Sequence, residues 1–556
     1  MKRILLLAAS LLSFSSFAQI DPTVEVNRSY DAAIGDIVKP DLPVTVADSL
    51  HRFDINFDYS IFNRRYAELY EFNPFEATSL GIKSTRRPPF FYTRIGAQYP
   101  LIPSAELYLQ AGTDKGAHFA LYGRHDSFWG NLPHAVNDDV TYDAGKMKNK
   151  VGGTLTYAWA TGEMTLDASY GLDRFDYPSN LHNNNAFDVS AKFSSANAEE
   201  NSIYYDVTLA YRNTLSKMTK DQAYVSEEQR SGFSLGEHYL RAAGLVGASF
   251  DKHRVYIDMN LEFAKYTNLH DFSTGVVEVS PMYQLRNRWL DAKIGIKFGN
   301  NYSLKGKEVD TDMESETSST FCPNIDARFT LAQKILWVRA LIGGGNDINQ
   351  YSKLLKDCPV LAPYSDLKFG NRPIDAKLAL ESYIFGRLSL NAFGSYTVFN
   401  DKLIFKPEFI DEDVPRIMAD YRDINLFSFG VEGFFQTQDF SLGGKIQWNS
   451  FKDSDKQNVT ELPKCEANAF LRYSFRERII AQADFNYRSG VSGKCVTGES
   501  YAVPAIVDLD FNLNFIINRH LAVYGKIGNI LNKRNQYVPL YVEPGRNFGG
   551  GLCVSF

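Results

Sequence analysis

The sequence is poor in the features that define several large classes of protein. Its 556 residues include only five cysteines, which lie far apart and form no Cys-x-x-Cys pair. This excludes a disulfide-rich scaffold and a zinc ribbon, although Cys465 and Cys495 could still form one disulfide. Beyond the N-terminus no apolar run approaches the roughly 18 residues that a membrane-spanning helix needs, which excludes a helical membrane bundle.

Cationic runs and catalytic motifs are absent as well. The formal net charge is -6 and no run of Lys and Arg occurs, so we expect no nucleic-acid partner. The sequence has no GxSxG nucleophile motif, no HExxH metal motif, no phosphate-binding loop and no dinucleotide fingerprint. The acidic run 308–316 lacks the glycine and the spacing of a calcium loop. We therefore expect no enzymatic activity, no cofactor and no metal site.

Tyrosine and phenylalanine are abundant, and the pattern in which they occur is that of strands. The chain has 32 Tyr and 40 Phe, and aromatic residues make up 14% of it. From about residue 88 onward, stretches of roughly ten residues alternate between apolar and polar side chains. Ten residues at about 3.3 Å each, tilted near 45°, span the roughly 25 Å apolar band of an outer membrane. The pattern predicts an all-β transmembrane antiparallel barrel over residues 88–556, with aromatic girdles at both interfaces.

Two of the clearest strands indicate which charges face inward. Within 255–263 the polar face carries Asp258 and Glu262, and within 507–515 it carries Asp508 and Asp510. Lys or Arg facing lipid at mid-depth costs about 2 to 4 kcal/mol, and Asp or Glu costs less. We therefore expect these four carboxylates to face the lumen.

Short and long connections alternate along the barrel. We predict short turns at 251–253, 286–288, 385–386, 436–439, 476–478 and 518–520, and long polar loops that include 125–150, 344–373 and 398–423. Tight periplasmic turns and long extracellular loops are typical of outer-membrane barrels. The count predicts about 22 strands, with 20 and 24 as alternatives.

The N-terminus predicts export to the cell envelope. Lys2 and Arg3 precede an apolar run that ends in small residues, so residues 1–18 are predicted to be a cleaved signal peptide. Residues 19–87 are interrupted by proline and are predicted to lie in the periplasm or in the lumen. Five arginines of this segment are candidates for filling the lumen by pairing with inward carboxylates: Arg52, Arg64, Arg65, Arg86 and Arg87. Contact with lipopolysaccharide phosphates or with solvent is the alternative for them.

The last strand is predicted to close the barrel. Phe548, Leu552, Val554 and Phe556 fall on one face, and Cys553 falls on the other. Because an exposed apolar edge invites aggregation, we expect this strand to pair with the first one, near residues 90–99, with the aromatic face toward lipid and Cys553 toward the lumen. The strand resembles the C-terminal strand of bacterial outer-membrane barrels. That resemblance implies three partners: the barrel assembly machinery, outer-membrane lipids and lipopolysaccharide.

Residues 505–556 carry the most specific resemblance. The run Gly-Lys-Ile-Gly-Asn-Ile-Leu-Asn-Lys-Arg at 525–534 precedes a last loop with Pro-Gly-Arg at 544–546 and then the terminal strand. This end resembles that of TonB-dependent receptors, and similar receptor-like barrels are found in the Bacteroidetes. The resemblance implies import of metal chelates, vitamins, glycans or peptides with a TonB-like partner or a surface lipoprotein.

The chain departs from that family in residues 19–87, which are far shorter than the family's plug domain. Two functions therefore stay open. One is solute uptake or passage across the outer membrane of a Gram-negative cell. The other is a structural or accessory barrel, without transport, in an outer-membrane complex.

Overall fold

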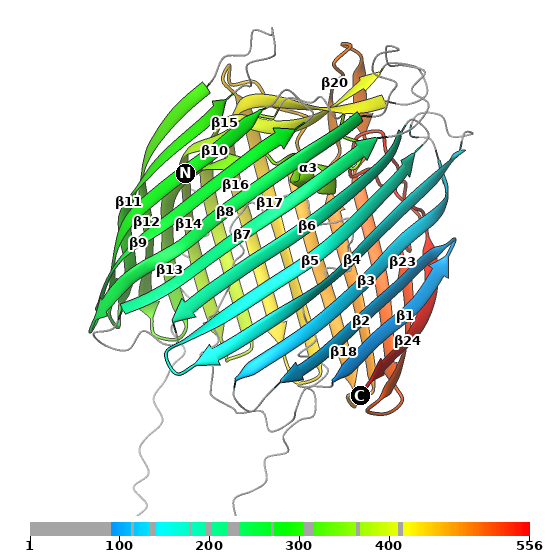
Figure 1. The fold of residues 1–556 in the computed structure, drawn as a ribbon, viewed down its shortest axis with the longest axis horizontal. Coiled ribbons are helices and arrows are strands. Elements are labelled where there is room, and N and C mark those ends of the chain that lie inside the picture. The colour runs from blue at the N-terminus through cyan, green and yellow to red at the C-terminus, as the bar shows by residue number, and fades with distance from the viewer. Residues whose placement is uncertain are drawn as a thin grey trace, which may run out of the picture. The chain divides into compact units, whose positions relative to one another are not determined.

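The protein folds into a β-barrel (Figure 1). The computed structural model describes residues 90–112, 116–133, 135, 141–177, 180–195, 203–218, 233–267, 272–304, 316–362, 367–409 and 415–556. No helix in these ranges is long and apolar enough to cross a membrane. All five cysteines lie in these ranges and none of them is in a disulfide, so Cys465 and Cys495 are not bridged.

Twenty-two antiparallel strands of the described ranges form one closed sheet. Their bounds are β1 (Phe91–Tyr99), β2 (Ile102–Gly112), β3 (Ala117–Pro133), β4 (Thr141–Trp159), β5 (Gly162–Tyr177), β6 (Asn180–Ser195), β7 (Ile203–Met218), β8 (Phe233–Phe250), β9 (His253–Thr267), β10 (Ser273–Arg286), β11 (Leu290–Leu304), β12 (Glu316–Ala332), β13 (Leu336–Ile348), β14 (Phe369–Ile384), β15 (Leu388–Phe409), β16 (Pro415–Gln436), β17 (Phe440–Asp453), β18 (Cys465–Phe475), β19 (Ile479–Arg488), β22 (Ile506–Ile516), β23 (Leu521–Gly528) and β24 (Asn547–Ser555). Each strand pairs with the next one in the sheet, and β20 (Val491–Lys494) and β21 (Ser500–Val503) form a separate hairpin between β19 and β22. The predicted antiparallel barrel of about 22 strands is confirmed.

The barrel closes between its first and last strands, and we call this pairing the seam. Arg94 lies opposite Cys553, and Tyr99 lies opposite Phe548. The N–H of Phe91 donates to the carbonyl oxygen of Phe556 at 3.1 Å, and the N–H of Phe556 donates back at 2.9 Å. The predicted pairing of the terminal strand with the first strand is therefore confirmed.

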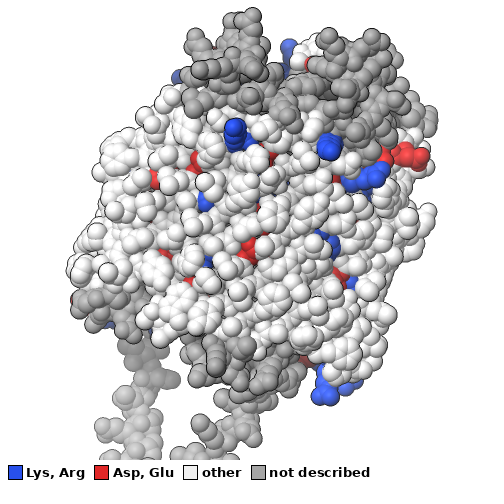
Figure 2. Space-filling view, in the orientation of Figure 1, with Lys and Arg blue, Asp and Glu red and all other residues white. Residues whose placement is uncertain are grey.

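The two faces of the wall differ because side chains alternate along each strand. On β9, Val255, Ile257 and Leu261 are among the exposed apolar residues, whereas Ala264 and Tyr266 are buried on the opposite face. Across the face of the barrel drawn in Figure 2, most of the wall is uncharged. This division places apolar side chains over the exterior of the wall.

The predicted short turns all coincide with observed connections between strands. Asp251 and Lys252, for example, join β8 to β9, and Asp251 adopts a positive φ of 51°. The long loops were predicted less well. β3 and β4 extend through most of 125–150, and β15 and β16 are 22 residues each and occupy most of 398–423. Polar side chains on both faces hide the alternation there, but the backbone ladder continues because it needs no apolar face.

The connection between β13 and β14 folds into the loop end of the barrel, where Figure 1 shows α3 (Tyr351–Asp357). We call residues 349–362 the cap. The cap shares one apolar cluster with the wall. Its buried members include Leu235, Tyr266 and Val276 of β8 to β10, Tyr351, Leu354, Leu355 and Leu361 of the cap, Ile417 of β16, and Val538 and Tyr541 of the β23–β24 connection. This cluster is the main apolar core inside the described part of the barrel.

Candidate functional site

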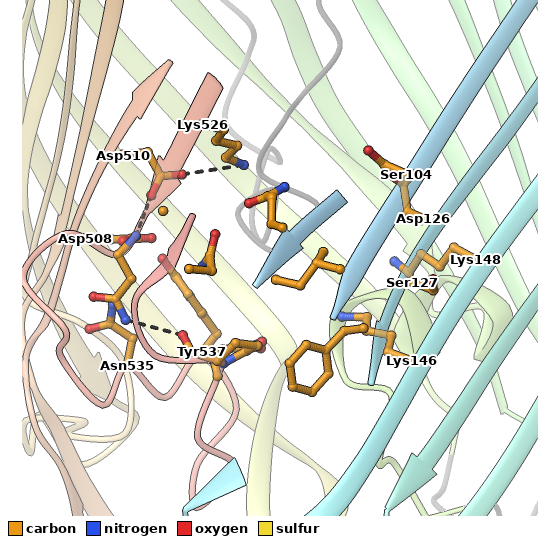
Figure 3. A pocket seen from close by; sticks show the side chains of 18 of the residues that line it. Ser104, Asp126, Ser127, Lys146, Lys148, Asp508, Asp510, Lys526, Asn535 and Tyr537 are labelled. Atoms are coloured by element: carbon orange, nitrogen blue, oxygen red, sulfur yellow. Dashed lines mark hydrogen bonds and ion pairs between the residues drawn. The ribbon is translucent and has the colours of Figure 1, made fainter. Parts of the chain in front are cut away.

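A cavity of about 160 Å³ lies in the lumen beside the seam, and we call it the seam cavity. One of its walls is formed by β1, β2, β3 and β4. The other is formed by β19, β22 and β23 with the β23–β24 connection. Figure 3 shows Lys146 and Lys148 on the first wall and Asp508 and Asp510 on the second, with the cavity between them.

Strand register positions the charges of the first wall. Glu106 of β2 lies directly opposite Arg94 on one side and Arg124 on the other. Two residues after Arg124 on β3, Asp126 lies opposite Lys148 of β4. Side chains directly opposite each other in an antiparallel pair lie on the same face of the sheet, so these five charges all face the lumen.

The two arginines beside Glu106 also make other contacts. The guanidinium of Arg94 stacks 3.8 Å from the ring centroid of Tyr524, and Arg124 forms an ion pair with Asp126. Glu106 is only 6% exposed, and its Oε2 has no hydrogen-bond partner among the described residues. A buried polar atom of this kind costs about 1 to 3 kcal/mol unless something pairs with it.

Two lysines of β4 complete the first wall. Lys146 and Lys148 lie two residues apart and therefore on the same face. Their Nζ atoms lie 5.5 Å and 5.9 Å from the ring centroid of Phe175, within the range of a cation–π contact. Among the described residues that line the cavity, this wall carries four cations, Arg94, Arg124, Lys146 and Lys148, against two carboxylates, and Lys148 also lies opposite Asp173 of β5.

The second wall has the opposite excess of charge. Its lining residues include three carboxylates, Asp508, Asp510 and Glu543, against Lys526. Lys526 Nζ lies 3.9 Å from Asp510 Oδ2, and the N–H of Asn529 donates to Asp510 Oδ1 at 2.9 Å. The charge of Asp510 is thus largely compensated.

The negative charge of Asp508 has fewer compensating partners than that of Asp510. The residue opposite it on β19 is Asn486, which carries no charge, and Asp508 Oδ1 has no hydrogen-bond partner in the described ranges. The hydroxyl of Tyr537, on the β23–β24 connection, is also buried without a hydrogen-bond partner there. Burial, with Asp508 nearby, raises the pKa of Tyr537 above its ordinary value. The hydroxyl is therefore neutral at physiological pH and is available as a hydrogen-bond donor.

The β23–β24 connection is held against the wall by side-chain to backbone bonds. The N–H of Val507 donates to Asn535 Oδ1 at 3.2 Å, and Asn535 Nδ2 donates to the carbonyl oxygen of Val507 at 3.3 Å. These two bonds place Tyr537 and Glu543 beside Asp508. The same connection supplies Val538 and Tyr541 to the apolar cluster of the cap, so the cavity and the cap share one element.

The cap contacts strands on two sides of the barrel. The N–H of Ser352 donates to Glu237 of β8 at 3.1 Å, and the N–H of Ala362 donates to the carbonyl oxygen of Ile417 of β16 at 2.8 Å. Ser352 Oγ also donates to Glu237. Because β8 and β16 are separated by seven strands, the cap crosses the lumen.

The structure brings together only part of the predicted lumen set. Asp508 and Asp510 line the seam cavity, whereas Asp258 and Glu262 lie on β9, outside it. Glu262 forms a 3.6 Å ion pair with Arg241 of β8. Cys553 is half-buried at the seam opposite Arg94 and does not line the cavity.

The other predicted positions lie on the exterior or outside the described ranges. Phe548, Leu552 and Phe556 are exposed, and Val554 lies on the same face of β24. The lumen-filling candidates Arg52, Arg64, Arg65, Arg86 and Arg87 all lie outside the described residues.

Sequence reasoning missed Lys146, Lys148, Glu106 and Tyr537. The two lysines fell within a predicted loop, yet with Lys150 they repeat at every second residue, and that spacing was the available signal of a strand face. Nothing in the sequence indicates that Tyr537 meets Asp508. No group of three or more His, Cys, Asp or Glu side chains with the arrangement of a metal site occurs in the described ranges.

No protein-family model and no curated protein matches the chain. Solved structures do match. The copper transporter OprC superimposes with a TM-score of 0.65 at 12% identity over 84% of this chain and 80% of the other. The FrpB iron transporter from Neisseria meningitidis gives 0.63 at 10% identity over 84% and 81%. The ferric-catecholate import receptor Fiu from E. coli K12 gives 0.61 at 10% identity over 85% and 82%.

At these identities the comparisons establish the fold. The resemblance to the barrel of TonB-dependent receptors is confirmed at the level of the fold.

Proposed function

We propose that this protein is an outer-membrane barrel that takes up or passes a small solute, which it holds in the seam cavity. The observation that carries the proposal is a charged cavity with unpaired polar atoms inside a closed barrel. Buried polar atoms without partners mark a place where a ligand, ordered water or an ion completes the hydrogen bonding. The neighbours of similar fold, described as transporters of copper and iron and as an import receptor, support uptake as the role.

The exterior supports an outer-membrane location. Exposed apolar side chains on the wall, such as Leu261, Phe298 and Phe429, suit contact with lipid acyl chains. Lipids and lipopolysaccharide are then the surroundings of the barrel. Phe548, Leu552, Val554 and Phe556 form the strand that the assembly machinery would recognise.

Because the cap lies inside the lumen, passage of a solute through the barrel requires a conformational change. Its apolar cluster and its contacts with β8 and β16 hold residues 349–362 across the lumen. Uptake therefore requires the cap to move, and a TonB-like protein or a surface lipoprotein is the partner class that could drive this movement. Residues 19–87, with the five candidate arginines named above, remain a second candidate for obstructing the lumen.

Conductance in planar lipid bilayers tests the proposal. Two variants are compared with the full chain: replacement of residues 351–358 by a Gly-Ser linker of equal length, and deletion of residues 20–86. We expect each to raise single-channel conductance and the combination to raise it further, because each removes one proposed obstruction. As a control, shortening the β20–β21 hairpin should leave the conductance of the full chain unchanged.

The second candidate function is an accessory barrel without transport, and the buried apolar core of the cap favours it. A cap packed this closely suits a permanently closed mouth. If the combined variant conducts no more than the full chain, and the full chain purifies from mild detergent with a stoichiometric partner, uptake is contradicted and the accessory role is supported.

A further inference from the structure

A group of basic side chains lies on β5 to β9, near the end of the barrel at which the cap lies. Arg174 of β5 lies opposite Asn183 of β6, which in turn lies opposite Lys217 of β7. His238 of β8 lies opposite Lys265 of β9. We call Arg174, Lys217, His238 and Lys265 the loop-end cluster.

The loop-end cluster is on the exterior of the wall. Each of its cations is an even number of residues from an exposed aromatic residue of its own strand, Tyr170 on β5, Tyr211 on β7 and Phe263 on β9. An even separation keeps two side chains on one face of a strand. Lys217 and Lys265 are exposed. On the face drawn in Figure 2, Lys and Arg side chains protrude from the wall close to this end of the barrel.

Carboxylates do not balance these cations. Among the described exterior residues close to the loop end of β5 to β9, Asp176 is the only carboxylate. Its Oδ2 lies 3.7 Å from Arg174 Nη2, and the buried Nε of Arg174 has no hydrogen-bond partner among the described residues. A buried donor without a partner marks a place where a ligand or ordered water completes the hydrogen bonding.

The excess of positive charge is confined to one arc of the wall. The next three strands, β10, β11 and β12, have no charged side chain at the corresponding positions of the described exterior, where Ser273, Asn300 and Ser319 are found. A uniform ring of cations would indicate a general adaptation to the membrane surface. A local excess indicates instead a site for a particular anion.

His238 adds a hydrogen-bond donor to the cluster. The hydroxyl of Tyr211 lies 2.9 Å from His238 Nδ1, and Asn213 Nδ2 lies 3.5 Å from the same atom. An amide nitrogen can only donate, so these contacts assign Nδ1 as the acceptor and place the proton of the neutral ring on Nε2. Nε2 can then donate to an oxygen of an anion that also contacts Lys265.

The position of the cluster indicates which anion it meets. The exposed aromatic side chains suit contact with acyl chains and with the membrane interface, so cations that lie beyond them toward the loop end are at the depth of lipid headgroups. Neighbouring strands lie about 4.8 Å apart, which separates the backbones at Arg174 and Lys217 by about 10 Å. Long side chains can converge from that distance on one headgroup. Phosphate is the anion that guanidinium and ammonium groups both bind through charge-assisted hydrogen bonds.

We propose that the loop-end cluster binds the phosphate groups of a lipopolysaccharide headgroup. The inference goes beyond solute uptake, and it takes only the outer-membrane location from the proposed function.

Native mass spectrometry of the detergent-solubilised full chain tests the inference with three probes: diphosphoryl lipid A, the same lipid with both phosphates removed, and inorganic phosphate. We expect diphosphoryl lipid A to bind at least roughly fivefold more tightly than the dephosphorylated lipid. Equal affinities would show that acyl chains alone carry the binding and would overturn the inference. Displacement of the lipid by micromolar inorganic phosphate would show a site for free anions and would overturn it as well.

Substitutions locate the site. Lys217→Gln and Lys265→Gln should each weaken diphosphoryl lipid A roughly fivefold, because one cation beside an anionic lipid surface contributes about this factor. Both should leave the dephosphorylated lipid unchanged. Lys252→Gln, in the β8–β9 turn at the opposite end of the barrel, is the matched control and should change neither affinity. All three side chains are exposed, so folding should be unaffected. Equal losses in the three variants would indicate attraction by net charge alone and would contradict the assignment.

The inference and the proposed function can fail separately. Phosphate-dependent lipid binding without conductance in any variant would leave the inference standing and remove transport. Conductance without phosphate-dependent binding would leave transport standing and remove the lipid site.

Discussion

At the scale of single residues, the seam depends on glycine. A Cβ added to Gly96 of β1 would overlap Tyr524 Oη and would lie 2.7 Å from the carbonyl oxygen of Gly550. The ring of Tyr524 lies against this bare backbone and supports the guanidinium of Arg94. The missing side chain at Gly96 therefore lets Tyr524 form part of the cavity wall.

Gly96→Ala should destabilise the barrel by about 1 to 3 kcal/mol, since overpacking forces neighbouring groups to shift. Urea unfolding in lipid vesicles, followed by tryptophan fluorescence, measures this free energy. Gly123→Ala is the matched control because its new Cβ would meet only Val151 Cγ1, at 3.9 Å, and it should change stability by no more than about 0.5 kcal/mol. Equal losses in the two variants would contradict the role of Gly96.

At the scale of elements, the alternation of apolar and polar residues predicted the strands of the barrel wall. It did not predict which side chains meet inside the lumen. Asp508 and Asp510 were predicted to face inward because β22 alternates along its whole length. Lys146 and Lys148 were missed because polar residues on both faces of that end of β4 resemble a loop. Alternation fixes the face of a side chain, but the meeting of Glu106 with Arg94 and Arg124 depends on register, which a single strand does not encode.

The cap could not be predicted for a related reason. Leu354, Leu355 and Leu361 lie in a segment that resembles an outer loop, and their burial depends on β8, β9, β10 and β16, which are distant in sequence. Ile417 of β16 is completely buried beneath the cap and forms a bridge with Leu361. The cap is therefore held by contacts that only the assembled barrel supplies.

Ile417→Ala should loosen the cap. Removing a fully buried isoleucine side chain costs about 2 to 5 kcal/mol, and here the loss falls on the contact between the cap and the wall. We expect faster amide hydrogen exchange in residues 351–362 and longer open times in planar bilayers. Leu378→Ala, at a position of β14 that is 60% exposed, is the control and should alter neither measurement. Unchanged exchange in Ile417→Ala would mean that the cap does not depend on this contact.

At the scale of the whole molecule, a charged side chain that faces lipid is costly, whereas one that faces the lumen is tolerated. We therefore expect charged substitutions on the exterior of the wall to destabilise the barrel. Adjacent residues of β19 allow a matched comparison, because Gln482 faces the lumen and Ala483 faces outward. Gln482 Nε2 donates to Asp484 Oδ1 at 2.9 Å, whereas Ala483 lies opposite Leu471 and Phe511 in the register of its neighbouring strands. Leu471 is exposed on the exterior.

Ala483→Lys should destabilise the barrel in lipid vesicles by about 2 to 4 kcal/mol, since it places an ammonium group among acyl chains near mid-depth. Gln482→Lys should be nearly neutral, because the new ammonium group can pair with Asp484 in the wet lumen. Equilibrium unfolding of both variants in vesicles gives the two free energies. If the exterior faced water, both substitutions would be tolerated to the same extent. Equal free energies of unfolding for the two variants in vesicles would therefore contradict a lipid-facing exterior. A loss confined to Ala483→Lys would support a wall on which Ala483 faces lipid and Gln482 faces the aqueous lumen.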